Sequence, residues 1–141
     1  MKKLSQTASS VEASLTRKLF NLASQFSDTI DLTLGDPDLG TPEAVKNAGC
    51  IAIQKGKTRY TPNAGIFNLR EKLAEKVSVE YEVVAKPENI AVTVGGMEGL
   101  FLALTCIVNP GDEVIVFEPY YVNYIQMIRM RGAVPVIVPA Y

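Results

Sequence analysis

The chain has 141 residues, the length of one domain, and 48% hydrophobic and 21% charged residues are ordinary for a globular protein that buries a core. Its formal net charge of −1 gives no basis for binding nucleic acid or an anionic membrane surface. It contains no histidine, so a mechanism that needs a histidine base or a histidine metal ligand is excluded for this chain.

The N-terminus lacks the apolar core of a signal peptide, and no apolar run reaches the ~18 residues of a membrane-spanning helix. Cys50 and Cys106 are isolated in the sequence, fall in predicted helices and form no metal-ligand spacing. We therefore expect a cytoplasmic protein with reduced, packed thiols and no metal site.

The N-terminal region begins with a helix signal. Ser9 and Glu12 have the spacing of a capping box, and apolar residues then recur at three- and four-residue steps. This pattern predicts an amphipathic helix over roughly residues 10–26. A short extended piece, Ile30 to Leu34, and a turn-rich loop over 35–38 should follow.

Two further helices are expected before the chain changes character. Thr41 and Pro42 are typical of a helix start, and this helix should run to about Lys55 and stop at Gly56. After a loop, apolar spacing predicts another amphipathic helix from residue 66 to about 81.

The second half alternates strands and helices. Ile90 to Val94 reads as a strand buried on both faces, and the apolar helix expected over 97–108 should be buried too. Strands over Val114 to Phe117 and Val134 to Val138 flank a helix over roughly 121–131. This β-α-β-α-β order is typical of a wound parallel sheet, so the predicted fold class is α/β.

The Gly95-Gly96 turn joins the predicted strand at 90–94 to the apolar helix, and it has three readings. A dinucleotide fingerprint is disfavoured because Met97 and Leu100 occupy positions where that motif needs glycine. A purely structural turn would use glycine for a positive φ. A seat for a single phosphate would use the N–H groups and dipole of the helix N-terminus.

Several segments, in this order, favour the phosphate seat, because together they strongly resemble the N-terminal part of the class I and II aminotransferases. These are pyridoxal 5′-phosphate (PLP) enzymes of fold type I. The segments that carry the resemblance are Leu34-Gly35-Asp36-Pro37-Asp38, Thr41-Pro42, Tyr60-Thr61-Pro62-Asn63-Ala64-Gly65 with Leu69-Arg70, Val92 to Leu100, Asn109 to Val114, and Pro119-Tyr120-Tyr121.

The resemblance implies roles for a few residues. The turn Gly95-Gly96-Met97 would cradle the cofactor phosphate through the backbone N–H groups of Gly96 and Met97. Tyr121 would stack on the pyridine ring, although it could be an ordinary surface tyrosine. Tyr60 would reach the phosphate of a dimer partner, or simply pack in its loop. Gly35 would lie near the substrate carboxylate, or be a plain turn glycine.

Arg59 and Arg70 are basic residues near these loops. Arg70 falls in a predicted helix, and we expect it to be solvated or ion-paired.

The resemblance covers only part of such an enzyme. The family's later half supplies the Schiff-base lysine, the partner of the pyridine nitrogen and the arginine that grips the substrate carboxylate. None of these has a counterpart here, so we name no catalytic residue and expect the isolated chain to be inactive. The implied organisation is an N-terminal helix and substrate-side loop over 1–40, and an incomplete PLP-binding large domain over 41–141.

The implied sheet is also incomplete. In the family, the strand matching Ile90 to Val94 is separated from the other two by strands that this chain lacks. Unpaired buried N–H and C=O groups would cost on the order of 1–3 kcal/mol each. We therefore expect either a small closed sheet of the three strands or strands added by another chain, with dimerisation or strand exchange preferred.

The resemblance implies an amino acid and a 2-oxo acid as substrates, without saying which, and a homodimer acting in amino acid metabolism. Two alternatives stay open: a PLP-dependent lyase that shares these N-terminal motifs, and a non-catalytic binding or oligomerisation module built on the same α/β unit.

Overall fold

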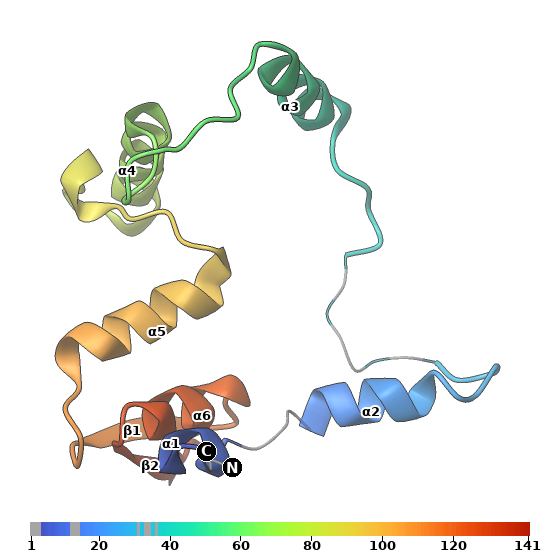
Figure 1. Ribbon diagram of the computed structural model, residues 1–141, viewed down its shortest axis with the longest axis vertical. Coiled ribbons are helices and arrows are strands. Elements are labelled where there is room, and N and C mark those ends of the chain that lie inside the picture. The colour runs from blue at the N-terminus through green and yellow to red at the C-terminus, as the bar shows by residue number, and fades with distance from the viewer. Residues whose placement is uncertain (1–3, 12–14, 31, 33–34, 36) are drawn as a thin grey trace. The chain divides into compact units, whose positions relative to one another are not determined.

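The computed structural model describes residues 4–11, 15–30, 32, 35 and 37–141 (Figure 1). Contacts group the chain into two compact units, one of Met1–Asp36 with Leu100–Tyr141 and one of Pro37–Gly99. These units are defined by contacts within the structure. They do not test the predicted division into domains 1–40 and 41–141, which stays a prediction.

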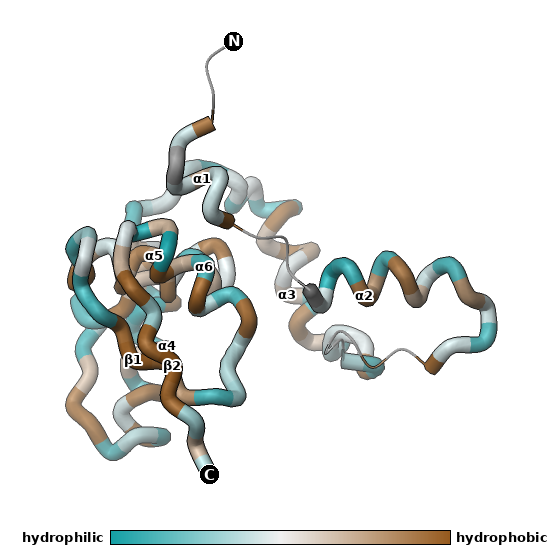
Figure 2. Tube along the Cα trace, turned by 90° about the horizontal axis from the view of Figure 1, so that it is seen from below, coloured by the Kyte–Doolittle hydropathy of each residue, from teal (hydrophilic) through white to brown (hydrophobic). Residues whose placement is uncertain are grey.

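The C-terminal part forms the β-α-β arrangement that the sequence predicts. Strands β1 (Glu113–Glu118) and β2 (Val134–Pro139) pair in parallel, with Val116 opposite Ile137. Helix α6 (Asn123–Met130) connects them and contacts β2. Figure 2 shows hydrophobic residues along both strands, as expected for branched side chains on a pleated surface.

The core of this unit is small. Ile128 on α6 is only 2% exposed, and apolar residues three or four positions apart on that helix form its buried side. A fully buried side chain of this size contributes about 1.5–3 kcal/mol to stability. The buried members of this core are Val116, Ile125, Ile128 and Ala133, with Leu104, Val108, Val114 and Tyr120 packed against them.

Two turns close the unit where the strands begin. Gly132 ends α6 with a φ of +72°, and its carbonyl oxygen accepts the Gly111 N–H at 2.9 Å. The Asp112 carbonyl oxygen accepts the Val134 N–H at 2.8 Å, while its carboxylate accepts the Asn109 N–H at 2.7 Å. These bonds tie the start of β1 to the start of β2.

The N-terminal region differs from the prediction of one helix over 10–26. It has two helices, α1 (Gln6–Ser10) and α2 (Leu15–Ala23). Ser5 caps α1, because its hydroxyl oxygen accepts a backbone N–H of the first turn, so the helix begins earlier than the predicted capping box. The other member of that box, Glu12, lies outside the described residues, as do residues 31, 33 and 34 of the predicted extended piece.

The unit of Pro37–Gly99 is mainly helical, and its helices fall where the sequence places them. Helix α3 (Glu43–Gln54) ends just before Gly56, whose φ is +66°, and α4 is Phe67–Tyr81. A 3-10 turn, η1 (Pro87–Asn89), replaces the predicted simple turn. No described residue of α3 is buried, whereas Ala74 of α4 is 3% exposed.

The predicted strand at Ile90–Val94 is wrong. In the part of the chain that is described, the sheet contains β1 and β2 alone, so Ile90–Val94 does not join it. Its residues are half-buried or exposed, with Val94 88% exposed. The expectation of a small closed sheet of three strands is therefore also wrong, while strands supplied by another chain stay a prediction.

Helix α5 (Gly95–Ile107) was expected to be buried, and this is wrong, since none of its residues is. Its apolar composition calls for covering layers, and the described residues do not supply enough of them. The two cysteines are free, as expected, but both are exposed rather than packed: Cys50 lies on α3 and Cys106 on α5.

Candidate functional site

The glycine turn at the start of α5 is the candidate site. Gly95 has a φ of +78°, a conformation that side chains disfavour. Its N–H donates to the Thr93 carbonyl oxygen at 2.8 Å, and the Thr93 hydroxyl donates to the Gly95 carbonyl oxygen at 2.9 Å. These two bonds fix the turn from which the helix starts.

The space in front of this turn is open. A Cβ built on Gly96 would meet no atom within 4 Å, and the same holds for Gly95. Helix α5 has 13 residues, and the N–H groups of its first turn point away from the helix body at the positive end of the dipole. The open space at the two glycines and the positive end of the helix dipole together favour an anion at this turn.

One acidic side chain opposes an anion at this place. The Glu98 carboxylate accepts the backbone N–H of Val94, the residue before the glycine pair. This hydrogen bond holds the Glu98 carboxylate beside the turn, at the peptide group just before Gly95. Sequence reasoning missed this contact, although an acid in the first turn of a helix is a common N-terminal signal.

Tyr121 follows the carboxyl end of β1, in the loop before α6. Tyr121 is 49% exposed, and its ring makes an edge-on contact with Tyr124, with centroids 5.5 Å apart and planes at 79°. The side-chain amide of Asn123 donates to the Tyr121 hydroxyl oxygen at 2.7 Å. These two neighbours hold the ring, and half of its surface stays accessible for stacking.

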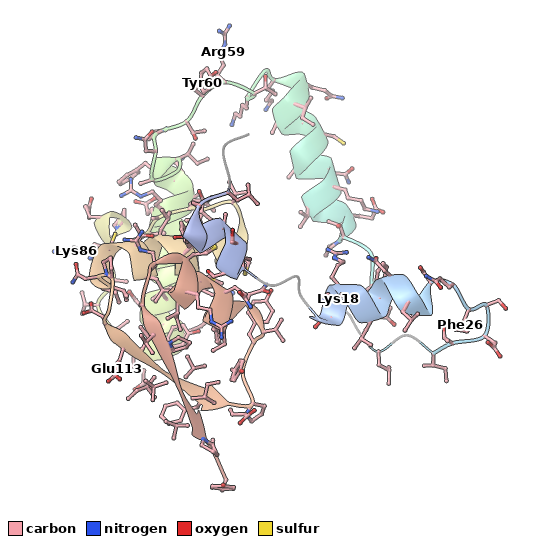
Figure 3. The ribbon with its side chains drawn as sticks, turned by 60° about the horizontal axis from the view of Figure 1, so that its bottom comes forward. Lys18, Phe26, Arg59, Tyr60, Lys86 and Glu113 are labelled. Atoms are coloured by element: carbon pink, nitrogen blue, oxygen red, sulfur yellow. The ribbon has the colours of Figure 1, made fainter. Side chains whose placement is uncertain are left out.

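Tyr60 and Gly35 are both exposed. The Tyr60 side chain is fully exposed on the loop between α3 and α4, where Figure 3 shows it beside Arg59. Gly35 is exposed, and a Cβ there would meet nothing within 4 Å. Tyr60 belongs to the same unit as the glycine turn, whereas Gly35 and Tyr121 belong to the other unit.

Arg70 was expected to be solvated or ion-paired, but the structure shows it bound to backbone carbonyl oxygens. It is half-buried, and its guanidinium donates to the Pro87 carbonyl oxygen from Nε at 2.9 Å and from Nη2 at 2.6 Å, and to Ile90 from Nε at 3.0 Å. The sequence signal was weak, because one arginine in a helix does not say which loop will return to it.

Other kinds of site are not found in the described ranges. No cluster of three or more potential metal ligands occurs there. None of the helices in that part of the chain has the length and apolar character needed to cross a bilayer.

Comparison with known proteins identifies the family. The family model "Aminotransferase class I and II" matches residues 27–141. A probable aspartate/prephenate aminotransferase of Thermus aquaticus is 46% identical over 143 residues, which cover 99% of this chain and 37% of that protein.

Solved structures agree. Aspartate aminotransferase from Thermus thermophilus with maleate matches with a TM-score of 0.92 and 44% identity, over 100% of this chain and 38% of that one. Aspartate aminotransferase from Thermotoga maritima matches with a TM-score of 0.90 and 36% identity, over 98% and 38%. The expected fold, part of a fold-type-I large domain, is confirmed.

The chain spans little more than a third of the length of these relatives. Within that span the match runs from the N-terminal helices to β2, and it includes the glycine turn and the tyrosine loop. The chain therefore belongs to the class I and II aminotransferases.

Proposed function

We propose that this chain is the N-terminal third of a PLP-dependent aminotransferase, which moves an amino group between an amino acid and a 2-oxo acid. The observation that carries the proposal is the open glycine turn at the start of α5, in a chain whose residues 27–141 match the family. Two relatives are described as aspartate/prephenate aminotransferases, so the proposed substrates are dicarboxylic amino acids and their 2-oxo acids.

When bound, PLP supplies the electron sink of the reaction, and the protein supplies binding and orientation. In this proposal Gly95, Gly96 and Met97 form the phosphate seat, with the N–H groups of the last two as donors. The accessible face of the Tyr121 ring stacks on the pyridine. Support comes from the empty space at Gly96 and from the two neighbours that hold Tyr121.

Two further residues complete the proposed site. Tyr60 reaches the cofactor phosphate of a second subunit in a homodimer, which is consistent with a side chain fully exposed in its own chain. Gly35 lies at the substrate carboxylate, where the absence of a side chain permits close approach. We place the protein in the cytoplasm.

The 141-residue chain by itself should not transaminate. The cofactor needs a lysine to anchor it, and the lysines of this chain offer no suitable setting. Lys55 and Lys57, for example, are exposed near the end of α3, among polar residues. The chain's own contribution is then to hold the phosphate and the ring.

The proposal is tested by titrating the chain with PLP and with pyridoxal, which lacks the phosphate, and following absorbance. We expect PLP to bind more tightly, and Gly96→Asp to remove that preference because it puts a carboxylate in the seat. Gly40→Asp, at an equally open glycine, is the matched control. Equal binding of both compounds to the unmodified chain would contradict the phosphate seat.

A second assay separates the alternatives. The chain is mixed with PLP, an amino acid and a 2-oxo acid, and amino-group exchange is measured. Exchange or β-elimination by the isolated chain would contradict its predicted incompetence, and β-elimination without exchange would also favour the lyase reading. Absence of any PLP binding would favour a non-catalytic module.

A further inference from the structure

The turn Pro62–Gly65 lies against the segment that leads into α5. The Gly65 N–H donates to Pro62 at 2.8 Å, and the Ala64 carbonyl oxygen accepts the Val92 N–H at 3.0 Å. Gly65 has a φ of +95°, and a Cβ there would lie 2.6 Å from Cγ2 and 2.8 Å from Cβ of Val92. Only glycine permits this approach, so the turn fixes where Val92 lies.

Arg70 holds the same segment from α4. Its guanidinium donates to the carbonyl oxygens of Pro87 and Ile90, at the two ends of η1. The planar fork of an arginine sets the direction of several donors at once, which an amine on a flexible stem does not. Arg70 thereby fixes the start of the segment, and the Pro62–Gly65 turn fixes its middle.

Thr93 links this segment to the start of α5. It exchanges hydrogen bonds with Gly95, one through its hydroxyl and one through its carbonyl oxygen. A Cβ on Gly99 would lie 3.3 Å from the Thr93 hydroxyl oxygen, so the first turn of α5 also packs closely on Thr93. A shift of residues 90–93 would therefore move the N-terminus of α5.

We propose that Gly65 and Arg70 are positioning residues for the N-terminus of α5. They hold the start and the middle of residues 90–93 and so aim the N–H groups of Gly96 and Met97. The described residues offer that segment no strand partner, so its place depends on these contacts. The inference rests on the proposed function only in taking those N–H groups as the phosphate seat.

The first test is Gly65→Ala, measured by ¹⁵N NMR of the full 141-residue chain without ligand. The control is Gly56→Ala, which also has a positive φ but open space around the Cβ position. We expect the amide resonances of Gly95 and Gly96 to shift in Gly65→Ala and to stay in place in the control. Unchanged resonances in Gly65→Ala would overturn the inference.

Two more variants guard against simple unfolding. Arg70→Lys keeps the charge and loses the fork, with exposed Lys72→Gln as its control, and we expect it to shift the same resonances. Combining Gly65→Ala with Val92→Gly removes the atoms that would collide, so the Gly95 and Gly96 resonances should return to those of Val92→Gly alone. No recovery in the double variant would overturn the proposed contact.

The ligand arm compares PLP with pyridoxal. Misplacing the seat should lower the preference for PLP about tenfold, the worth of roughly one charge-assisted hydrogen bond, and leave pyridoxal binding unchanged. Unfolding would weaken both ligands equally. A preference retained in both variants would overturn the inference and leave the proposed function standing. No preference in the unmodified chain would overturn the phosphate seat, while the NMR arm still decides the positioning role.

Discussion

Two apolar segments of similar composition differ in secondary structure in this molecule. Residues 114–117 form the middle of β1, whereas Ile90–Val94 forms no strand among the described residues. Both segments read as buried strands of a parallel sheet, and both lead into a turn and a helix. Among the described residues, only residues 114–117 have a neighbouring strand, because β2 lies beside them after a single connecting helix.

The difference is one of partners rather than propensity. A strand is stabilised by cross-strand hydrogen bonds and by a covered face, and both come from other parts of the chain. β1 obtains them from β2 and α6. Ile90–Val94 has no paired strand among the described residues. It instead donates the Val92 N–H to Ala64, accepts a hydrogen bond from Arg70, bonds locally with residues 87, 95 and 98, and stays half-buried or exposed.

The largest expected effect comes from supplying the missing partner. Fusing to Tyr141 the remaining sequence of the Thermus thermophilus relative should turn Ile90–Val94 into a paired strand. Amide exchange at Ala91 and Thr93 should then slow on the order of 10³-fold, because exchange from a core strand needs far more costly opening. The β1 amides serve as the internal control, and exchange that stays fast in the fusion would refute the partner explanation.

The next effect compares the cores directly. Ile128→Ala should destabilise the β-α-β unit by about 2–5 kcal/mol, because it empties part of a small core around a residue only 2% exposed. Val94→Ala, at 88% exposure, should change stability by less than about 0.5 kcal/mol. Urea unfolding followed by circular dichroism measures both, and equal losses would show that the apolar segment at 90–94 is buried after all.

A smaller effect concerns the turn that lets β2 return. Gly132→Ala should cost about 1–2 kcal/mol, because it forces a side chain to a φ of +72° and places its Cβ 3.3 Å from Pro110. Gly49→Ala, inside α3 with open space around it, should be neutral or stabilising. Thermal melts of the two variants decide this, and a Gly132→Ala protein as stable as the unmodified chain would count against the turn's role.

Charge at the start of α5 should have a modest effect. Glu98→Gln keeps an acceptor for the Val94 N–H and removes a negative charge beside the glycine turn. Anion binding should improve about two- to fivefold, since a charge at a helix N-terminus is worth about 0.3–1 kcal/mol. Phosphate competition against PLP measures it, with Glu113→Gln as the control, and weaker binding in Glu98→Gln would mean that the carboxylate supports the seat.

The smallest effect is a surface ion pair on α4. A hydrogen bond to Glu75 and its charge raise the pKa of Lys72 from 10.5. The folded state favours the protonated amine, so the stabilisation is full below pH 10.5 and is lost as pH rises through the raised pKa. An NMR titration should find the Lys72 midpoint falling back toward 10.5 in Glu75→Gln, and an unchanged midpoint would exclude the pair in solution.

Much of this molecule follows from local sequence. Helices α3 and α4 and the strands β1 and β2 lie close to their predicted bounds, because periodicity and the glycine and proline signals act within a few residues. The Gly95-Gly96 turn also follows from local sequence, since glycine readily adopts the positive φ that this turn requires. The family membership came from motif order along the chain, and the match over residues 27–141 confirms it.

Tertiary structure alone decided the rest. Their apolar sequences predicted that Ile90–Val94 and α5 are buried. Burial, however, needs packing partners from residues distant in the sequence. The contacts of Arg70 with Pro87 and Ile90, and of Gly65 with Val92, join positions 17 to 27 residues apart. Local sequence patterns do not predict such long-range contacts, because the contacts depend on which loop packs against which helix in the folded chain.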